Sequence, residues 1–113
     1  MMTSHLTTHV LDASAGHPAT GIDVLLEHKD GAGWTEIATG TTNDDGRIAQ
    51  LGPERLASGT YRLTFAVADY FAATGTATFY PEITVTFAVD SDQKHYHVPV
   101  LLSPFAYTTY RGS

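Results

Sequence analysis

The chain contains no cysteine among its 113 residues. This absence excludes a disulfide framework, a thiolate nucleophile and any metal site that is built on cysteine. Positive charge is scarce as well, because six Lys and Arg stand against twelve Asp and Glu and leave a formal net charge of −6 at pH 7. Nucleic acids and anionic membranes require a basic patch, so neither is an expected partner. Any positive field must be local, built by a few Arg and His side chains.

Long apolar runs are also missing. No stretch approaches the roughly 20 residues that a membrane-spanning helix needs, and the first residues show no basic segment followed by an apolar one, so no secretory signal is evident. Neither a glycine-rich phosphate loop nor a Gly-x-Ser-x-Gly nucleophile elbow occurs, which disfavours phosphoryl transfer and a serine triad. We therefore expect a soluble cytoplasmic protein.

What the sequence does contain is enough apolar material for one core. Hydrophobic residues make up 42% of the chain and charged residues 16%, a balance typical of globular proteins. At 113 residues the chain fits one domain, residues 1–113.

The apolar residues recur with a period of two. Residues 83–90 alternate Ile, Val, Phe and Val with small or polar residues, and residues 61–65 alternate in the same way. Such alternation predicts half-buried strands. Only residues 67–74, which end at Gly75, resemble a helix, and this segment is short. Further strands are expected at residues 7–11, 22–28, 34–41, 95–102 and 107–111. The sequence predicts an all-β, antiparallel sandwich of seven to eight strands with one short helix.

Six histidines are present, and three of them are candidates for chemistry. His9 lies in an early strand among threonines. His95 and His97 share one face of a late strand, opposite Tyr96 and Val98, so they point to solvent or to another subunit if the latter two face the core. A neutral histidine can take a proton from water near neutral pH. The remaining histidines are expected to be solvated or merely satisfied by hydrogen bonds: His5, His17 and His28.

The last four residues, Tyr110 to Ser113, have the composition of a site rather than of a linker. A hairpin centred near Ser103 and Pro104 would set residue 110 or 111 opposite His97. An arginine there stays cationic and can hold a planar anionic or carbonyl group through paired N–H donors. Such a cluster suits water attack on a polarised carbonyl, with fixed donors that stabilise the developing oxyanion.

Two signatures in this sequence resemble those of the transthyretin fold. The first runs through HVLD at 9–12, Gly16, PA at 18–19 and IDV at 22–24. The second runs through YHVP at 96–99, LSPF at 102–105 and Tyr107. The central DGR at 45–47 fits as well, so the resemblance covers nearly the whole chain.

Within that fold, hormone carriers typically have Lys where this chain has His9, and they lack a Tyr-Arg-Gly-Ser ending. The chain therefore resembles the transthyretin-related family of 5-hydroxyisourate hydrolases. The resemblance implies opening of a ring amide of 5-hydroxyisourate, on the path from urate toward allantoin. It also implies a homotetramer, a dimer of dimers whose sites lie where the dimers meet, with no cofactor and no metal.

The resemblance further implies a set of site residues. It gives acid/base roles to His9 and His97 without deciding which is the base, it favours His97 over His95, and it makes Arg47 the residue that binds and polarises the substrate. The other substrate-binding residues that it implies are Tyr110 and Arg111, which would shape and charge the pocket, and Ser113, which would contribute its hydroxyl or the terminal carboxylate.

Two alternatives stay open at this point. The same fold could serve as a non-enzymatic carrier of an aromatic small molecule, which would bind tightly without turnover. His9, His95 and His97 could instead form a metal site, since two histidines spaced by one residue on a strand are a possible ligand pair.

Overall fold

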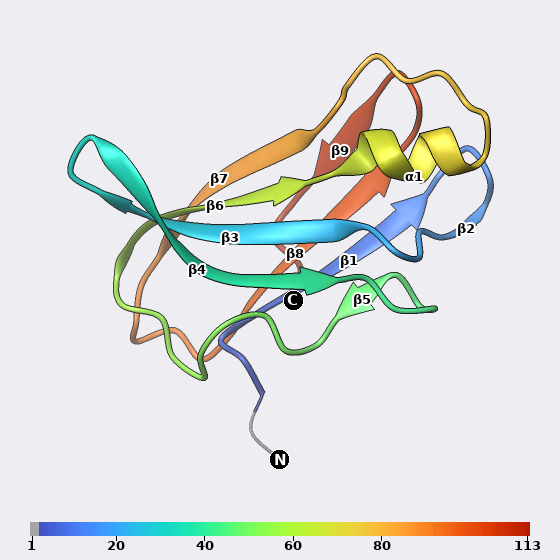
Figure 1. Cartoon of the computed structure of the whole chain (residues 1–113). Helices are drawn as coiled ribbons and strands as arrows, with labels where there is room; N and C mark the ends of the chain where they lie inside the picture. Colours follow the sequence, from blue (N-terminus) through green and yellow to red (C-terminus); the bar gives the residue numbers. More distant parts are fainter. Residues whose placement is uncertain (1–2) are drawn as a thin grey trace.

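Two β-sheets pack face to face in the computed structural model, which describes residues 3–113 (Figure 1). The first sheet has the order β2 (His17–Pro18), β1 (Leu6–Asp12), β8 (Tyr96–Leu102) and β9 (Tyr107–Thr109), with β5 (Arg47–Ile48) also paired to β1. The second has the order β4 (Gly33–Thr41), β3 (Asp23–Asp30), β6 (Gly59–Phe65) and β7 (Ile83–Val89). Helix α1 (Val67–Ala73) follows β6.

The core lies between the sheets and is built by alternate residues of each strand. In β1 every second residue from Leu6 to Asp12 is buried, and in β6 the same holds for Tyr61, Leu63 and Phe65. This is the period-two pattern that the sequence shows, because successive side chains of a strand point to opposite faces. The alternate residues of β1, which are Thr7, His9 and Leu11, point to the outer face of the first sheet.

The predicted all-β sandwich with one short helix is confirmed, with two additions. Most pairs of strands are antiparallel, but β1 and β8 run parallel, with Thr7 beside His97 and Val10 beside Val100. The strands also number nine among residues 3–113, because β2 and β5 are two-residue pieces that the sequence did not reveal. Both additions concern β1, which becomes the central strand of the first sheet.

The one helix in the described part of the chain is seven residues long. Across residues 3–113, no helix has the length and apolar content to span a membrane. Helix α1 is tied to the first sheet by Tyr70, whose hydroxyl donates to Asp12 Oδ2 at 2.7 Å. Burial opposes ionisation of Asp12, but hydrogen bonds from Tyr70, Ala15 and Ser14 hold the pKa of its carboxyl below the usual value.

Candidate active site

The outer face of the first sheet gathers three of the predicted site residues. Thr7 and His9 stand two residues apart in β1 and share this face. His97 is the cross-strand partner of Thr7, and Arg47 is the partner of His9 on the other side of β1. Directly paired residues point to the same face. The register therefore places His9, Arg47 and His97 side by side, as the acid/base and substrate-binding prediction requires.

Arg47 reaches this place through a tight turn. The side-chain oxygen of Asn43 accepts from the backbone N–H groups of Asp45 and Arg47, at 2.9 and 3.0 Å. Gly46 has a φ of 74° and lies directly against the backbone of β1, where its carbonyl accepts from Val10 N at 2.7 Å. A residue with a Cβ would be strained in that conformation and would meet the carbonyl of Val10. The turn thus locks the short strand β5 onto β1.

His97 is half-buried, and its surroundings favour the neutral form of its ring. Burial lowers the pKa of its imidazole, and the nearby Arg47, His9 and His95 lower it further, against a smaller opposing contribution from Thr7. Its Nδ1 lies 2.8 Å from the Thr7 hydroxyl. When the ring donates from Nδ1 to Thr7, its Nε2 is left as the proton acceptor.

The C-terminal tail returns to His97, one residue later than the hairpin prediction. Gly112, rather than residue 110 or 111, is the cross-strand partner of His97, and its N–H donates to the His97 carbonyl at 2.8 Å. A Cβ at position 112 would lie 2.5 Å from His97 Cδ2. The glycine therefore allows the tail to lie directly against the imidazole ring.

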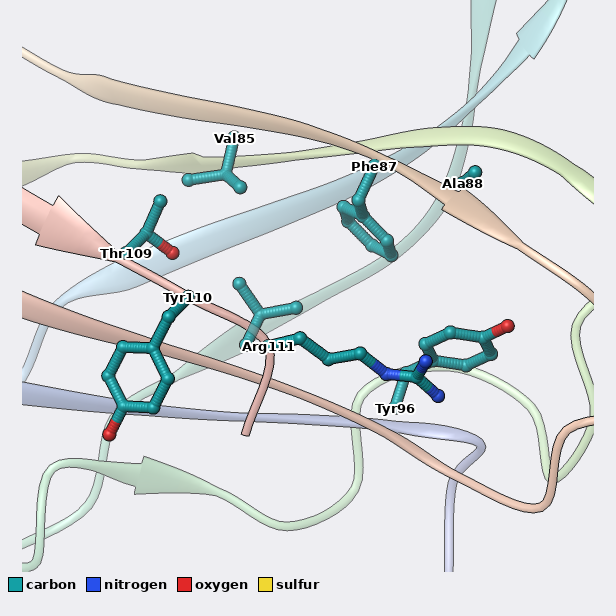
Figure 2. Close-up of a pocket in the computed structure, with 8 residues that line it drawn as sticks. Val85, Phe87, Ala88, Tyr96, Thr109, Tyr110 and Arg111 are labelled. Carbon is teal, nitrogen blue, oxygen red and sulfur yellow. The ribbon is translucent and has the colours of Figure 1, made fainter. Parts of the chain in front are cut away.

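The tail side chains divide between two directions. The Arg111 guanidinium lies over the ring of Tyr96, 4.6 Å from its centroid (Figure 2). Tyr96 and His97 are adjacent in β8 and point to opposite faces, so Arg111 lies on the face opposite to His97. It lines a pocket of about 280 Å³ at the edge of the sandwich, between Val85 and Phe87 of β7 and the tail. The ring of Tyr110 points away from those two residues and is 57% exposed, and Ser113 is exposed beyond Gly112. Within one chain, the predicted group of tail residues around His97 is only partly assembled.

The other histidines are accounted for individually. His5 is buried and satisfied, since Nδ1 accepts from Leu56 N at 2.9 Å and Nε2 lies 2.7 Å from the Gln93 carbonyl. His28 stacks on Tyr61, and His17 is exposed. No group of three or more His, Cys, Asp or Glu side chains in residues 3–113 is arranged to hold a metal ion. His9, His95 and His97 therefore do not form the metal-ligand set considered from the sequence.

Two residues of the site were missed by reasoning from the sequence. Thr7 contacts both His97 and His95, and Gly112 lies against the His97 ring. The polar threonine two residues before His9 was a possible signal for the first. For Gly112 the signal was a glycine inside an otherwise reactive tetrapeptide, because a small residue often marks a close approach of two segments.

Known proteins match this chain over nearly its whole length. The HIUase/Transthyretin family model matches residues 6–112. A 5-hydroxyisourate hydrolase of Salmonella dublin is 49% identical over 109 residues, which span 96% of this chain and 80% of that protein. The solved 5-hydroxyisourate hydrolase of Klebsiella pneumoniae superposes with a TM-score of 0.85 at 36% identity, over 98% of this chain and 99% of that one.

A transthyretin from Sparus aurata has the same fold, with a TM-score of 0.90 at 34% identity and 96% of each chain covered. The backbone alone therefore does not separate the solved hydrolase from the solved transthyretin. With a family model that spans the sandwich from β1 to the tail, this chain belongs to the HIUase/Transthyretin family.

Proposed function

We propose that the chain hydrolyses the ring amide of 5-hydroxyisourate, a step of urate degradation. The observation that carries the proposal is His97, a half-buried imidazole with a lowered pKa that shares one face with Arg47 and His9. The names of the Salmonella and Klebsiella relatives supply the substrate. A catalytic base must be neutral at the working pH, and this environment keeps His97 neutral.

The arrangement supports a simple sequence of steps. His97 Nε2 takes a proton from a water molecule while the water oxygen attacks the carbonyl carbon of the ring amide. Electrons of the C=O bond move onto its oxygen, and the cation of Arg47 stabilises the oxyanion that forms. The carbonyl then re-forms, the C–N bond of the ring breaks, and the ring nitrogen receives a proton. His9, beside Arg47, is placed to supply that proton.

Arg47 is well suited to stabilise the oxyanion and to bind the substrate. Its guanidinium stays cationic at all relevant pH values and offers several N–H donors in a plane, which matches the oxygen and nitrogen edge of a purine-derived ring. The chain as a whole is acidic, with a formal net charge of −6. Attraction for an electron-rich substrate must therefore be local to the site.

We further propose that the site is completed in a homotetramer. Leu101 is 37% exposed and Tyr110 57% exposed. The paired residues Leu101 and Thr108 lie on the same face as His97, and Tyr110 follows on that face by alternation. A second copy that covers this face would enclose the substrate between two subunits. It would also bring the exposed tail residues Tyr110 and Ser113 of one subunit against the cluster of His9, Arg47 and His97 in the neighbouring subunit.

The direct test follows the decay of freshly generated 5-hydroxyisourate in the presence and absence of the protein. We expect rapid decay with the wild-type protein and loss of at least about a hundredfold in kcat/KM for His97→Ala, His9→Ala and Arg47→Ala. His17→Ala is the matched control, because His17 is exposed and lies outside the cluster. Wild-type protein that binds the substrate without exceeding its spontaneous decay would favour a carrier and overturn the hydrolase proposal.

A further inference from the structure

Thr7 connects two histidines through one hydroxyl group. Its Oγ1 lies 2.8 Å from His97 Nδ1 and 2.9 Å from His95 Nε2. Both distances are hydrogen-bond distances. The pair His95 and His97, which the sequence set on one face of a strand, is thus joined by a residue from a different strand.

A threonine hydroxyl has one proton to donate, while its oxygen can accept. With both contacts formed, one imidazole donates to Oγ1 and the other accepts from it. The tautomers of the two rings are therefore coupled. When His97 donates from Nδ1, its Nε2 is free to act as a base, and Thr7 then donates to His95 Nε2. When the chain of hydrogen bonds reverses, His97 carries its proton on Nε2.

The backbone holds this connection in place. Thr7 is directly paired with His97 in the parallel ladder of β1 and β8. Threonine is branched at Cβ and therefore has restricted side-chain rotation. His97 is half-buried within the cluster, whereas His95 stands exposed just before β8 begins. The three groups form a path from the site to water.

We propose that Thr7 and His95 form a proton outlet for His97, an inference that rests on the proposed hydrolase function. After His97 Nε2 has taken a proton from water, the ring carries N–H groups at both nitrogens. The Nδ1 proton moves to Thr7 Oγ1 while the Thr7 hydroxyl proton moves to His95 Nε2. His97 is left neutral with its proton on Nε2, and His95 carries the positive charge and releases its Nδ1 proton to solvent. After the product leaves, the Nε2 proton of His97 passes to water while the chain of hydrogen bonds reverses: Thr7 returns a proton to His97 Nδ1, His95 Nε2 returns one to Thr7, and His95 Nδ1 takes one from water. His97 Nε2 is then free to act as the base again.

The charges around His97 favour this direction of transfer. Arg47 faces it from β5, His9 faces it from β1, and His95 precedes it in the chain. Each of these is positive or becomes positive on protonation, so a protonated His97 is repelled from several sides. The exposed position of His95 allows water to solvate the same charge. Thr7 and His95 are positioning and relay residues in this scheme, and neither needs to touch the substrate.

The kinetic test compares Thr7→Val, Thr7→Ser and His95→Gln with the wild-type protein. Thr7→Val removes the hydroxyl at nearly constant shape, and Thr7→Ser restores it. We expect Thr7→Val and His95→Gln to lower kcat about tenfold or more with little change in KM, and Thr7→Ser to retain most activity. Exogenous imidazole buffer should raise the kcat of His95→Gln toward the wild-type value. The proposed proton outlet would be overturned if Thr7→Val and His95→Gln kept the wild-type kcat. It would also be overturned if imidazole did not raise the kcat of His95→Gln.

A second measurement separates this inference from the proposed function. Side-chain ¹⁵N NMR of the free protein reports the tautomer and protonation of each ring without any substrate. Titration of His95 should perturb the Nδ1 signal of His97 in the wild-type protein and not in Thr7→Val. Independent titration in the wild-type protein would overturn the hydrogen-bonded chain. An inactive wild-type protein with coupled rings would instead overturn the hydrolase function and, with it, the catalytic role of the outlet.

Discussion

The surroundings of His97 shift the ionisation of its imidazole away from that of a free histidine. His97 lies in the same strand as buried Tyr96 and Val98, and it points to the opposite face. Burial lowers the pKa of its imidazole first, and the positive charge of Arg47 is the next cause. The direction of this change fits a general base, because a base must remain unprotonated to act.

The pH dependence of activity follows from this direction. We expect kcat/KM to fall as the pH drops through the pKa of His97, on an acid limb that lies below the ordinary histidine value of about 6.5. Above that limb His97 is neutral and can act as the base. Arg47→Gln removes a positive neighbour, so its residual activity should show an acid limb at higher pH. The measurement is a pH profile of kcat/KM for both proteins.

Lys29→Gln is the control for that experiment. It also removes one positive charge, but from the hairpin where Lys29 pairs with Trp34, in the other sheet. Its acid limb should coincide with that of the wild-type protein. If the acid limb of the kcat/KM profile lies at the same pH in Arg47→Gln as in the wild-type protein, Arg47 does not lower the pKa of His97.

Gly112 offers a second test at the scale of one residue. A methyl group at this position would lie 2.5 Å from His97 Cδ2, so Gly112→Ala must displace the tail or the imidazole. Misplacement of a catalytic group by about 1 Å can cost about a hundredfold in rate. We expect kcat/KM to fall about tenfold or more, while circular dichroism and the melting temperature stay close to those of the wild-type protein.

Gly33→Ala provides the comparison, because the nearest atom to a Cβ there is 3.9 Å away. It should leave turnover unchanged. Equal activity of Gly112→Ala and the wild-type protein would show that the tail yields freely and does not fix the ring.

Strand β1 organises both the fold and the candidate site. It pairs with β2, β5 and β8, and its outer face presents Thr7 and His9. The alternation of β1 and β8 was readable in the sequence, and so was the outward position of His97. Their parallel pairing was not readable, because it joins segments that are about ninety residues apart and leaves no local pattern. The contact between Thr7 and the two histidines depends on that pairing.

The register of the tail was predicted within one residue for a related reason. A hairpin fixes which residues face each other once its turn is known, and the turn near Ser103 was readable. The sequence could not show that pairing of β8 with β9 ends at Thr109 and resumes only at Gly112. It also could not show that Arg111 would lie over Tyr96 instead of facing His97.

The attachment of α1 to β1 leads to a prediction about stability. Tyr70→Phe removes the hydrogen bond to the Asp12 carboxylate and should lower the free energy of unfolding by about 1–3 kcal/mol, as expected for a bond to a charged group. Since Tyr70 helps to lower the pKa of Asp12, this stabilisation is present above the unfolded-state pKa and is lost as the pH falls through the folded-state value. Urea denaturation at several pH values measures both effects.

The difference between wild type and Tyr70→Phe should therefore shrink in strong acid. Tyr80→Phe is the matched control, because its hydroxyl has no charged partner among the contacts described for residues 3–113. A loss of stability in Tyr70→Phe that stays constant from neutral pH into acid would mean that packing, and not the carboxylate, holds the helix.

The face of the first sheet that carries His97 also carries the partly exposed side chain of Leu101. Leu101 is the cross-strand partner of Thr108. Tyr110 follows on the same face and is also exposed, so a second subunit placed there would bury two apolar side chains rather than one. The proposed tetramer would cover it and would remove water from the site at the same time.

Leu101→Glu tests this assembly. We expect the wild-type protein to sediment at four times the chain mass of 12.2 kDa. A carboxylate buried without a partner between subunits costs several kcal/mol, so the variant should dissociate at concentrations about a hundredfold or more above those that dissociate the wild-type protein. Because the site would then be open on one side, kcat/KM should fall together with the tetramer and recover as the protein concentration is raised.

Leu25→Glu places the same charge on the outer face of the other sheet, where Leu25 is partly exposed in β3. This control should remain tetrameric and active, since that face plays no part in the proposed contact. Analytical ultracentrifugation measures the oligomeric state of both variants, and turnover is measured at the same protein concentrations. A Leu101→Glu protein that is monomeric or dimeric yet fully active would show that one chain carries a complete site, and Tyr110 and Ser113 would then act on the His97 cluster of their own subunit.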